Sequence, residues 1–146
     1  MPGVKEGSQP VSEQTGKDHR FFISFLAART YLMLLYYDLF LARKDFGALY
    51  NKVRLYPISS QPTRADITEK ICGAVDTACI WYWKEVLCLQ RSAVSACLLR
   101  RYGIAAQMVI GVQQFPFRAH AWVEVDGRIV NDKPYMRELY AVLDHC

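Results

Sequence analysis

Three residues in the second half of the chain carry side chains that could together perform acyl transfer: Cys88, His120 and Asp132. A cysteine thiolate is a nucleophile, an imidazole moves protons, and a carboxylate can orient the imidazole ring. Cys88 opens a run rich in small residues, His120 opens an alternating run, and Asp132 closes the next short run. Because the three come in this order on a predicted helix, strand and strand end, the pattern predicts a cysteine acyl-transfer enzyme.

The predicted position of Cys88 at a helix N-terminus favours this chemistry. The partial positive charge at that end of a helix stabilises a thiolate relative to a thiol, and the free N–H groups of the first turn can bind an oxyanion. A free cysteine on its own is more often an inert apolar side chain. The interpretation of Cys88 as a nucleophile therefore depends on the histidine and the carboxylate that accompany it.

The strand that begins with His120 has two unlike faces. Alternation places His120, Trp122 and Glu124 on one face and only aliphatic side chains on the other. We expect the aliphatic face to join the core, although a lone histidine in a strand is more often structural than catalytic. The histidine face would then line a cleft, with Trp122 and Glu124 as candidate substrate-binding residues.

Three carboxylates could orient His120. Asp126 belongs to an Asp-Gly hairpin turn and has a structural role there. Glu124 is two residues along the same strand, about 6.5 Å away, and would approach the ring at a poor angle. Asp132 returns on the neighbouring strand, but simple alternation points it to the opposite face. A bulge or a divergence at the strand end would be needed, so the residues alone leave this choice open.

Periodicity and turn signals predict an α+β domain in which helices come first and a nucleophile-bearing helix packs on a small antiparallel sheet. Residues 1–19 are polar and are predicted to be a disordered start, 20–64 a helical region that could dock a partner, and 65–146 the core. The predicted helices cover residues 20–43, 44–56, a stretch from 66, 88–103 and 134–143, and the strands cover 104–112, 120–125 and 128–132. Asp66 and Glu69 approximate a capping box, and no glycine or proline marks a break between Cys79 and Cys88.

Composition narrows the class of protein. The net charge of +4 comes from scattered lysines and arginines, which argues against nucleic acid as a partner. Five cysteines without a CxxC pair indicate neither a disulfide framework nor a metal site, and a reduced, cytoplasmic setting is expected. Residues 20–43 are long and apolar enough for a membrane span, but Arg29 and Asp38 would each cost about 2.5–3.5 kcal/mol at a bilayer centre. A buried or partner-docking helix is therefore favoured over a span.

The second half of the chain resembles a known family. The segments CLQRSAVSACLLRRYGIAAQMVIGV and FRAHAWVEVDGRIVND are similar to those of the transglutaminase-like cysteine peptidases of lasso-peptide biosynthesis. These are the leader peptidases encoded apart from their small leader-recognition partner. The similarity runs from Cys88 to Asp132, with the H-A-W-V-E run as its most specific part, and the first half of the chain shares only generic apolar helices.

The resemblance implies a papain-like core, a break before Cys88, and a triad of Cys88, His120 and Asp132. It also implies that the protein cuts the leader from a precursor peptide with a separate recognition protein. A cyclase that then closes the lasso ring is a further candidate partner, and no cofactor or metal is required. Two alternatives stay open at this point: transglutaminase-type acyl transfer to an amine, and a non-catalytic docking protein of the maturation complex.

Overall fold

Helices precede a four-stranded antiparallel sheet in the computed structural model, which describes residues 12–60 and 66–146, with side chains from residue 20 onward. The predicted α+β class is confirmed. The helices are α1 (Ser12–Ala42), α2 (Phe46–Arg54), α3 (Ile67–Ile80), α4 (Cys88–Arg101) and α5 (Met136–Leu139). The strands are β1 (Ala106–Gln113), β2 (Arg118–Val125), β3 (Arg128–Ile129) and β4 (Ala141–His145), in the spatial order β3-β2-β1-β4.

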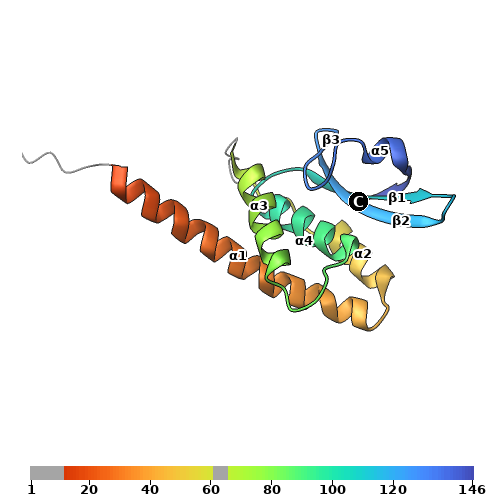
Figure 1. Ribbon diagram of the computed structural model, residues 1–146, viewed down its shortest axis with the longest axis horizontal. Helices are drawn as coiled ribbons and strands as arrows, with labels where there is room; N and C mark the ends of the chain where they lie inside the picture. The colour runs from red at the N-terminus through yellow and green to blue at the C-terminus, as the bar shows by residue number, and fades with distance from the viewer. Residues whose placement is uncertain (1–11, 61–65) are drawn as a thin grey trace, which may run out of the picture.

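Helix α4 lies at the centre of the domain. It packs against α1, α2 and α3 on one side and against β1 and β2 on the other (Figure 1). Every residue from Ser92 to Arg100 is buried. Small side chains such as Ser92, Ala93 and Ala96 let the sheet approach this helix closely, as their spacing in the sequence predicted.

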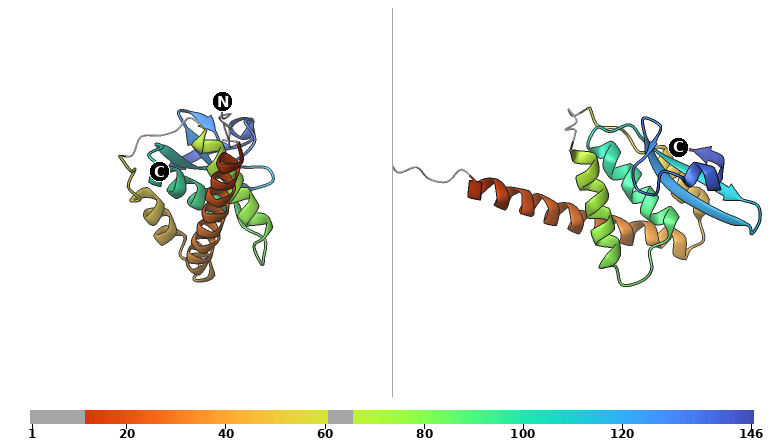
Figure 2. Two further views of the ribbon diagram at one scale, coloured as in Figure 1. Left: turned by 90° about the vertical axis from the view of Figure 1, so that its left-hand side faces the viewer. Right: turned by 45° about the horizontal axis from the view of Figure 1, so that its top comes forward.

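Helix α1 contributes a narrow buried stripe and otherwise faces outward. Leu26, Thr30, Leu34 and Tyr37 recur at helical spacing and are at most 1% exposed. The C-terminal half of α1 packs beside α3 and α4, and its N-terminal half extends past the other elements (Figures 1 and 2). The helix begins at Ser12, so the disordered start predicted for residues 1–19 is wrong for residues 12–19, while residues 1–11 lie outside the described part.

The apolar part of α1, Arg20–Ala42, is long and apolar enough to cross a membrane by length and composition alone, and 22% of its most apolar window is buried. Its buried stripe belongs to the main core. Asp38, near its end, pairs with Lys84 at 2.6 Å and accepts a hydrogen bond from Tyr82 at 3.3 Å. These contacts attach the stretch to the domain, as in a core helix.

The same contacts explain why α3 and α4 are separate helices, a break before Cys88 that the local sequence pattern did not reveal. Helix α3 ends at Ile80, and a turn over residues 81–87 leads into α4. Tyr82 and Lys84 hold that turn against α1, so the helix is ended by contacts distant in sequence. At the other end of α3 the expected capping box is wrong, because the side chain of Asp66 makes no cap hydrogen bond and pairs with Lys70.

The hairpin of β2 and β3 follows the predicted register. Val125 pairs with Arg128 and Glu124 with Ile129 around a turn in which Asp126 and Gly127 have φ of 50° and 74°. Positive φ at both central residues is the requirement of a type I′ turn, which the Asp-Gly sequence meets. The predicted return strand 128–132 is shorter than expected, because β3 ends at Ile129.

The predicted helix over residues 134–143 is largely wrong. Only α5 is helical, and the chain then forms β4, which pairs antiparallel with β1. Backbone hydrogen bonds between Met108 and Cys146, of 2.7 and 2.9 Å, continue this pairing. All five β4 residues are exposed, so no alternating pattern marks the strand. Pairing covers the outer edge of β1, which would otherwise present open N–H and C=O groups.

Candidate active site

His120 and Asp132 are in direct contact. Nε2 of His120 lies 2.7 Å from Oδ2 of Asp132, and the two side chains are 22% and 16% exposed. The other carboxylate oxygen accepts a hydrogen bond of 2.7 Å from the backbone N–H of Lys133. A carboxylate held in this way favours the imidazole tautomer with its proton on Nε2. Nδ1 is then the nitrogen that can take a proton from a thiol.

Asp132 reaches the histidine because the chain leaves the sheet just before it. The last backbone hydrogen bond to β2 runs from Val130 N–H to the carbonyl of Val123, at 3.0 Å. Beyond it the side chain of Asn131 takes over. Its Oδ1 accepts from the N–H of Val123 at 2.6 Å, and its Nδ2 donates to Oγ of Ser92 at 3.1 Å. This is the divergence that alternation required, and the sequence reasoning had assigned no role to Asn131.

Cys88 is the first residue of α4 and is partly exposed. One turn further along the same side, Oγ of Ser92 donates to the carbonyl of Ala121 at 2.9 Å, next to His120. This hydrogen bond connects the first turns of α4 to β2, the strand that carries His120. Through Asn131, Ser92 also connects α4 to the loop that carries Asp132. Within the described residues no hydrogen bond joins the sulfur of Cys88 to the imidazole of His120. Hydrogen bonds between a nucleophile and its base are often longer before substrate binds.

The start of α4 provides backbone donors beside the thiol. Leu87, the N-cap, has an extended backbone (ψ 149°), and no side chain caps this helix end. The first backbone hydrogen bond of the helix runs from Arg91 N–H to the carbonyl of Leu87 at 2.9 Å. The N–H groups of residues 88–90 therefore precede the first intrahelical bond, and groups of this kind can bind an oxyanion.

Trp122 is buried rather than cleft-lining. It is 0% exposed and packs with Val109 and Met136 in a second, smaller apolar cluster. Alternation was correct about its face, but α5 and Tyr140 cover that face. The prediction that Trp122 lines an open cleft is therefore wrong, because local pattern does not reveal a covering segment that follows later in the chain.

The carboxylate of Glu124 accepts hydrogen bonds from two side chains, those of Trp122 and Arg137. Its Oε1 accepts from Nε1 of Trp122 at 2.8 Å, and Arg137 donates to both of its carboxylate oxygens. The hydrogen bond from Arg137 holds the pKa of this carboxyl below its usual value, against the opposing effect of burial. Glu124 is 3% exposed and borders a cavity of about 200 Å³ together with Arg137 and His145. Its partners explain why it does not serve the histidine.

Tyr140 and Gly111, which the sequence reasoning missed, shape the surroundings of the imidazole. The ring of His120 lies 5.3 Å from that of Tyr140 and 6.2 Å from that of Trp122, centroid to centroid. Gly111 pairs with His120 across the two strands, and a Cβ there would come within 2.6 Å of Trp122 and 2.8 Å of Tyr140. A glycine inside a strand often marks such a close approach, and this was the available signal.

Comparisons relate the chain to known proteins. The family model of the transglutaminase-like superfamily matches residues 33–144, which include all three predicted triad residues. The microcin J25-processing protein McjB of Escherichia coli is 43% identical over 56 residues. That match covers 38% of this chain and only 27% of the length of McjB. No solved structure matches the chain.

Proposed function

The chain belongs to the transglutaminase-like superfamily, and we propose that it is a cysteine endopeptidase that removes the leader from a lasso-peptide precursor. The proposal is supported by the superfamily match, by the partial identity to a microcin-processing protein, and by the motifs around Cys88 and His120. The observation that carries it is the 2.7 Å contact between His120 and Asp132, on a loop and strand tied to the first turns of the Cys88 helix.

The proposed chemistry proceeds through an acyl-enzyme. The thiolate of Cys88 attacks the carbonyl carbon of the leader–core bond, and the oxyanion is bound by N–H groups at the start of α4. His120, oriented by Asp132, gives its proton to the leaving amine of the core peptide. The same imidazole then takes a proton from water, which attacks the thioester and releases the leader as a free acid. Apart from the substrate and the attacking water, each of these steps uses side chains and backbone groups of this chain.

Transfer of the acyl group to an amine is the alternative on the same triad. It differs only in the second nucleophile, so the product distinguishes the two outcomes. Hydrolysis in ¹⁸O-labelled water places one labelled oxygen on the new C-terminus of the leader, whereas transfer gives a cross-linked product without label. The reagents are a lasso-peptide precursor and its leader-recognition protein, and the products are identified by mass spectrometry. A precursor left uncut by the wild-type protein with its partner contradicts the proposed function.

We further propose that the helices between Phe21 and Tyr56 dock the leader-recognition protein with its bound leader. Helix α1 exposes more apolar surface than a small domain usually leaves open. The exposed side chains, called here the α1 face, are Phe21 (77%), Phe25 (55%), Leu32 (66%), Leu35 (42%), Tyr36 (45%) and Leu39 (51%). Large apolar side chains gathered in this way are typical of a partner site. The lasso cyclase would act afterwards, on the freed core peptide.

Hydrogen exchange tests the docking role directly. Protection of amides within residues 21–56 is expected when the recognition protein and leader are added together. The matched control is the variant Leu32→Asp, which places a charge in the α1 face and should reduce that protection. Protection confined to residues after Cys88 would reject the docking role and leave this segment as scaffold.

A further inference from the structure

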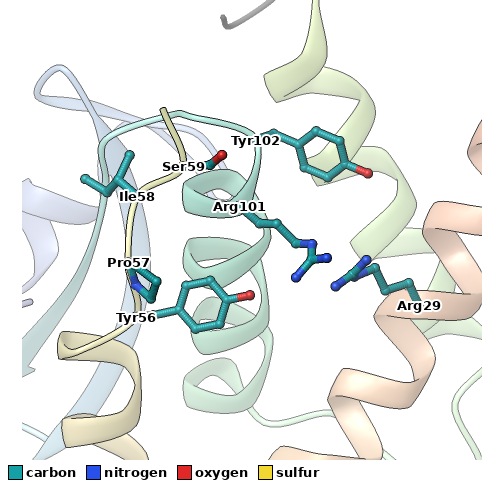
Figure 3. A pocket seen from close by; sticks show the side chains of 7 residues that line it. All are labelled: Arg29, Tyr56, Pro57, Ile58, Ser59, Arg101 and Tyr102. Atoms are coloured by element: carbon teal, nitrogen blue, oxygen red, sulfur yellow. The ribbon is translucent and has the colours of Figure 1, made fainter. Parts of the chain in front are cut away.

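A cavity of about 660 Å³ lies between α1, the segment after α2, and the C-terminal end of α4 (Figure 3). It is lined by Arg29 of α1, by Tyr56 and Ile58 of the segment, and by Arg101 and the C-cap residue Tyr102 at the end of α4. Cys88 stands at the other end of α4. Thirteen residues at about 1.5 Å rise place the two ends about 20 Å apart. The cavity therefore cannot contact the reacting atoms and is a separate site.

Two arginines converge in this cavity without a carboxylate between them. Figure 3 shows the guanidinium groups of Arg29 and Arg101 directed toward one another, with the hydroxyl of Tyr56 on the same side. Neither arginine forms an ion pair with any residue that the structure describes. Nε of Arg29 is buried and has no hydrogen-bond partner there. Two guanidinium groups that lack an ion-pair partner among the described residues and face one cavity suit an anionic ligand, which would supply acceptors to both.

The wall of the cavity is held by a third arginine. Arg100 is 6% exposed, and it donates to the carbonyls of Ala106 at 2.8 Å and Val53 at 2.5 Å. Its own carbonyl accepts from the N–H of Ser59 at 2.8 Å, which fixes the segment that carries Tyr56. No described carboxylate pairs with Arg100, so its charge adds to the positive potential. Basic residues in the last turn of a helix offset the helix dipole, which accounts for Arg101 but not for Arg29 in the middle of α1.

An apolar groove adjoins the basic cavity. Arg29 also borders a second hollow of about 470 Å³ on α1, whose other lining residues are Phe25, Ala28, Leu32, Met33 and Tyr36. Arg29 therefore lines both hollows. A ligand that fits both has a carboxylate next to large apolar side chains, which is the chemistry of an acidic and apolar peptide segment.

We propose that the cavity between Arg29 and Arg101 binds a carboxylate side chain of the precursor's leader, with neighbouring apolar residues of the leader in the groove on α1. Guanidinium groups bind carboxylates through paired, charge-assisted hydrogen bonds. The 20 Å to Cys88 corresponds to about six extended residues at about 3.3 Å each. The anchoring acid thus lies at least about six residues before the cleaved bond. The proposal rests on the proposed function for the identity of the peptide, but binding itself requires no cleavage.

The binding test uses the full chain with Cys88→Ala, which cannot process a peptide. Acetyl-Leu-Glu-Leu-amide is titrated while the Nε–H resonances of Arg29 and Arg101 are followed by NMR, with acetyl-Leu-Gln-Leu-amide and inorganic phosphate as comparison ligands. We expect saturable shifts with the glutamate peptide and affinity about tenfold lower for the glutamine peptide. Equal affinity for the two peptides would overturn the proposal. Tighter binding of phosphate than of the glutamate peptide would also overturn it and identify a small-phosphate site.

Matched variants then assign the effect to the cavity. In the Cys88→Ala background, Arg29→Gln and Arg101→Gln should each lower the affinity for the glutamate peptide about tenfold. Arg118→Gln removes the same charge from an exposed position at the start of β2. This variant should change the affinity for the glutamate peptide by less than about twofold. Equal losses in all three variants would show a general charge effect and reject the site.

Steady-state kinetics on the full-length precursor distinguish a failure of this proposal from a failure of the proposed function. With wild-type Cys88 and full-length precursor, Arg29→Gln and Arg101→Gln should raise KM and leave kcat unchanged, because the cavity holds the leader away from the reacting atoms. A fall in kcat at constant KM would contradict the anchoring role. A precursor that wild-type protein does not cut refutes the peptidase, whereas the peptide-binding result still decides the cavity.

Discussion

Helices α1 and α4 cross the same domain, yet they differ in how their surfaces are used. Every side chain of α4 from Ser92 to Arg100 is buried between helices and sheet. Helix α1 buries a stripe from Leu26 to Tyr37 and leaves large apolar side chains such as Leu32 exposed beside it. Close packing on all sides fixes a helix within a fraction of an ångström, which a nucleophile at its end requires. A helix packed on one side is instead available to a partner.

The difference suggests that the proposed chemistry depends on α4 and the proposed recognition depends on α1. Ser92 forms hydrogen bonds with the strand of His120 and with Asn131, so the packing of α4 also positions the residues of the proposed triad. The basic cavity lies where the two helices meet, with Arg29 from α1 and Arg101 from α4. Substitutions at the start of α4 should therefore stop the chemistry, and substitutions on the exposed side of α1 should affect only recognition.

The largest effect is expected from removing the nucleophile or the base. Cys88→Ala and His120→Ala should each reduce precursor cleavage by about 10³-fold or more, because the proposed mechanism uses the thiol to form the acyl-enzyme and the imidazole to resolve it. Circular dichroism and the melting temperature should stay close to wild type, since both side chains are partly exposed. Cys79→Ala is the matched control and should keep full activity. Wild-type activity in Cys88→Ala would contradict the peptidase proposal.

Asp132→Asn should give the next largest loss, about 10²–10⁴-fold in kcat, because an amide cannot stabilise the imidazolium and favours the wrong tautomer. Steady-state kinetics on the precursor measure it. Glu124→Gln is the comparison, since its carboxylate serves Trp122 and Arg137. If Glu124→Gln stopped cleavage and Asp132→Asn did not, the assignment of the orienting carboxylate would be wrong.

The contrast between the two helices can be tested with one substitution type. Leu98→Asp in α4 should destabilise the domain by more than about 3 kcal/mol, because the side chain is 0% exposed and a charge there has no partner. Leu32→Asp in α1 should change the free energy of unfolding by less than about 0.5 kcal/mol, since Leu32 is 66% exposed. Urea denaturation compares them, and similar losses would show that α1 is covered in the isolated protein.

Thiol labelling distinguishes Cys88 from the core cysteines. Burial raises the pKa of Cys72 and of Cys97 to about 11, and it also raises the pKa of Cys79 and Cys146. A rise of the pKa from 9.0 to about 11 leaves about a hundredfold less thiolate at neutral pH. Iodoacetamide should therefore label Cys88 first, as followed by peptide mass spectrometry. Equal labelling of all five would argue against a preformed site.

The smallest effect concerns how the free energy of unfolding depends on pH. The pKa of Glu124 is lowered from 4.5, chiefly by Arg137, so its ion pair stabilises the fold above that pH and is lost as the pH falls through the lowered value. Glu124→Gln should cost about 1–3 kcal/mol at pH 7. The difference from wild type should shrink steadily below about pH 4. A difference that stays constant down to pH 2 would mean that the ion pair contributes nothing.

Much of this arrangement is local in origin and could be predicted. Small residues and the double arginine predict α4, the Asp-Gly pair predicts the hairpin, and its register follows from the two-residue turn. The position of Asp132 could not be derived from alternation, because it depends on Asn131 leaving the ladder to bond Val123 and Ser92. That choice came from family resemblance.

The errors share one physical cause, which is contact between distant segments. Strand β4 forms because the edge of β1 is open, although its own residues are exposed and give no alternation. The end of α3 depends on Lys84 and Tyr82 meeting Asp38 of α1. Trp122 is buried because α5 folds over it. In each case the deciding partner lies more than ten residues away, beyond the reach of a periodic pattern.

Intact-protein mass spectrometry of the acid-quenched reaction tests the central claim most directly. Protein, recognition partner and precursor are mixed and stopped within the first turnover. We predict an adduct on Cys88 with the mass of the leader joined as a thioester, which disappears as free leader forms and never appears in Cys88→Ala. Cleavage of the precursor by Cys88→Ala at the wild-type rate, with no adduct in either protein, would contradict the account.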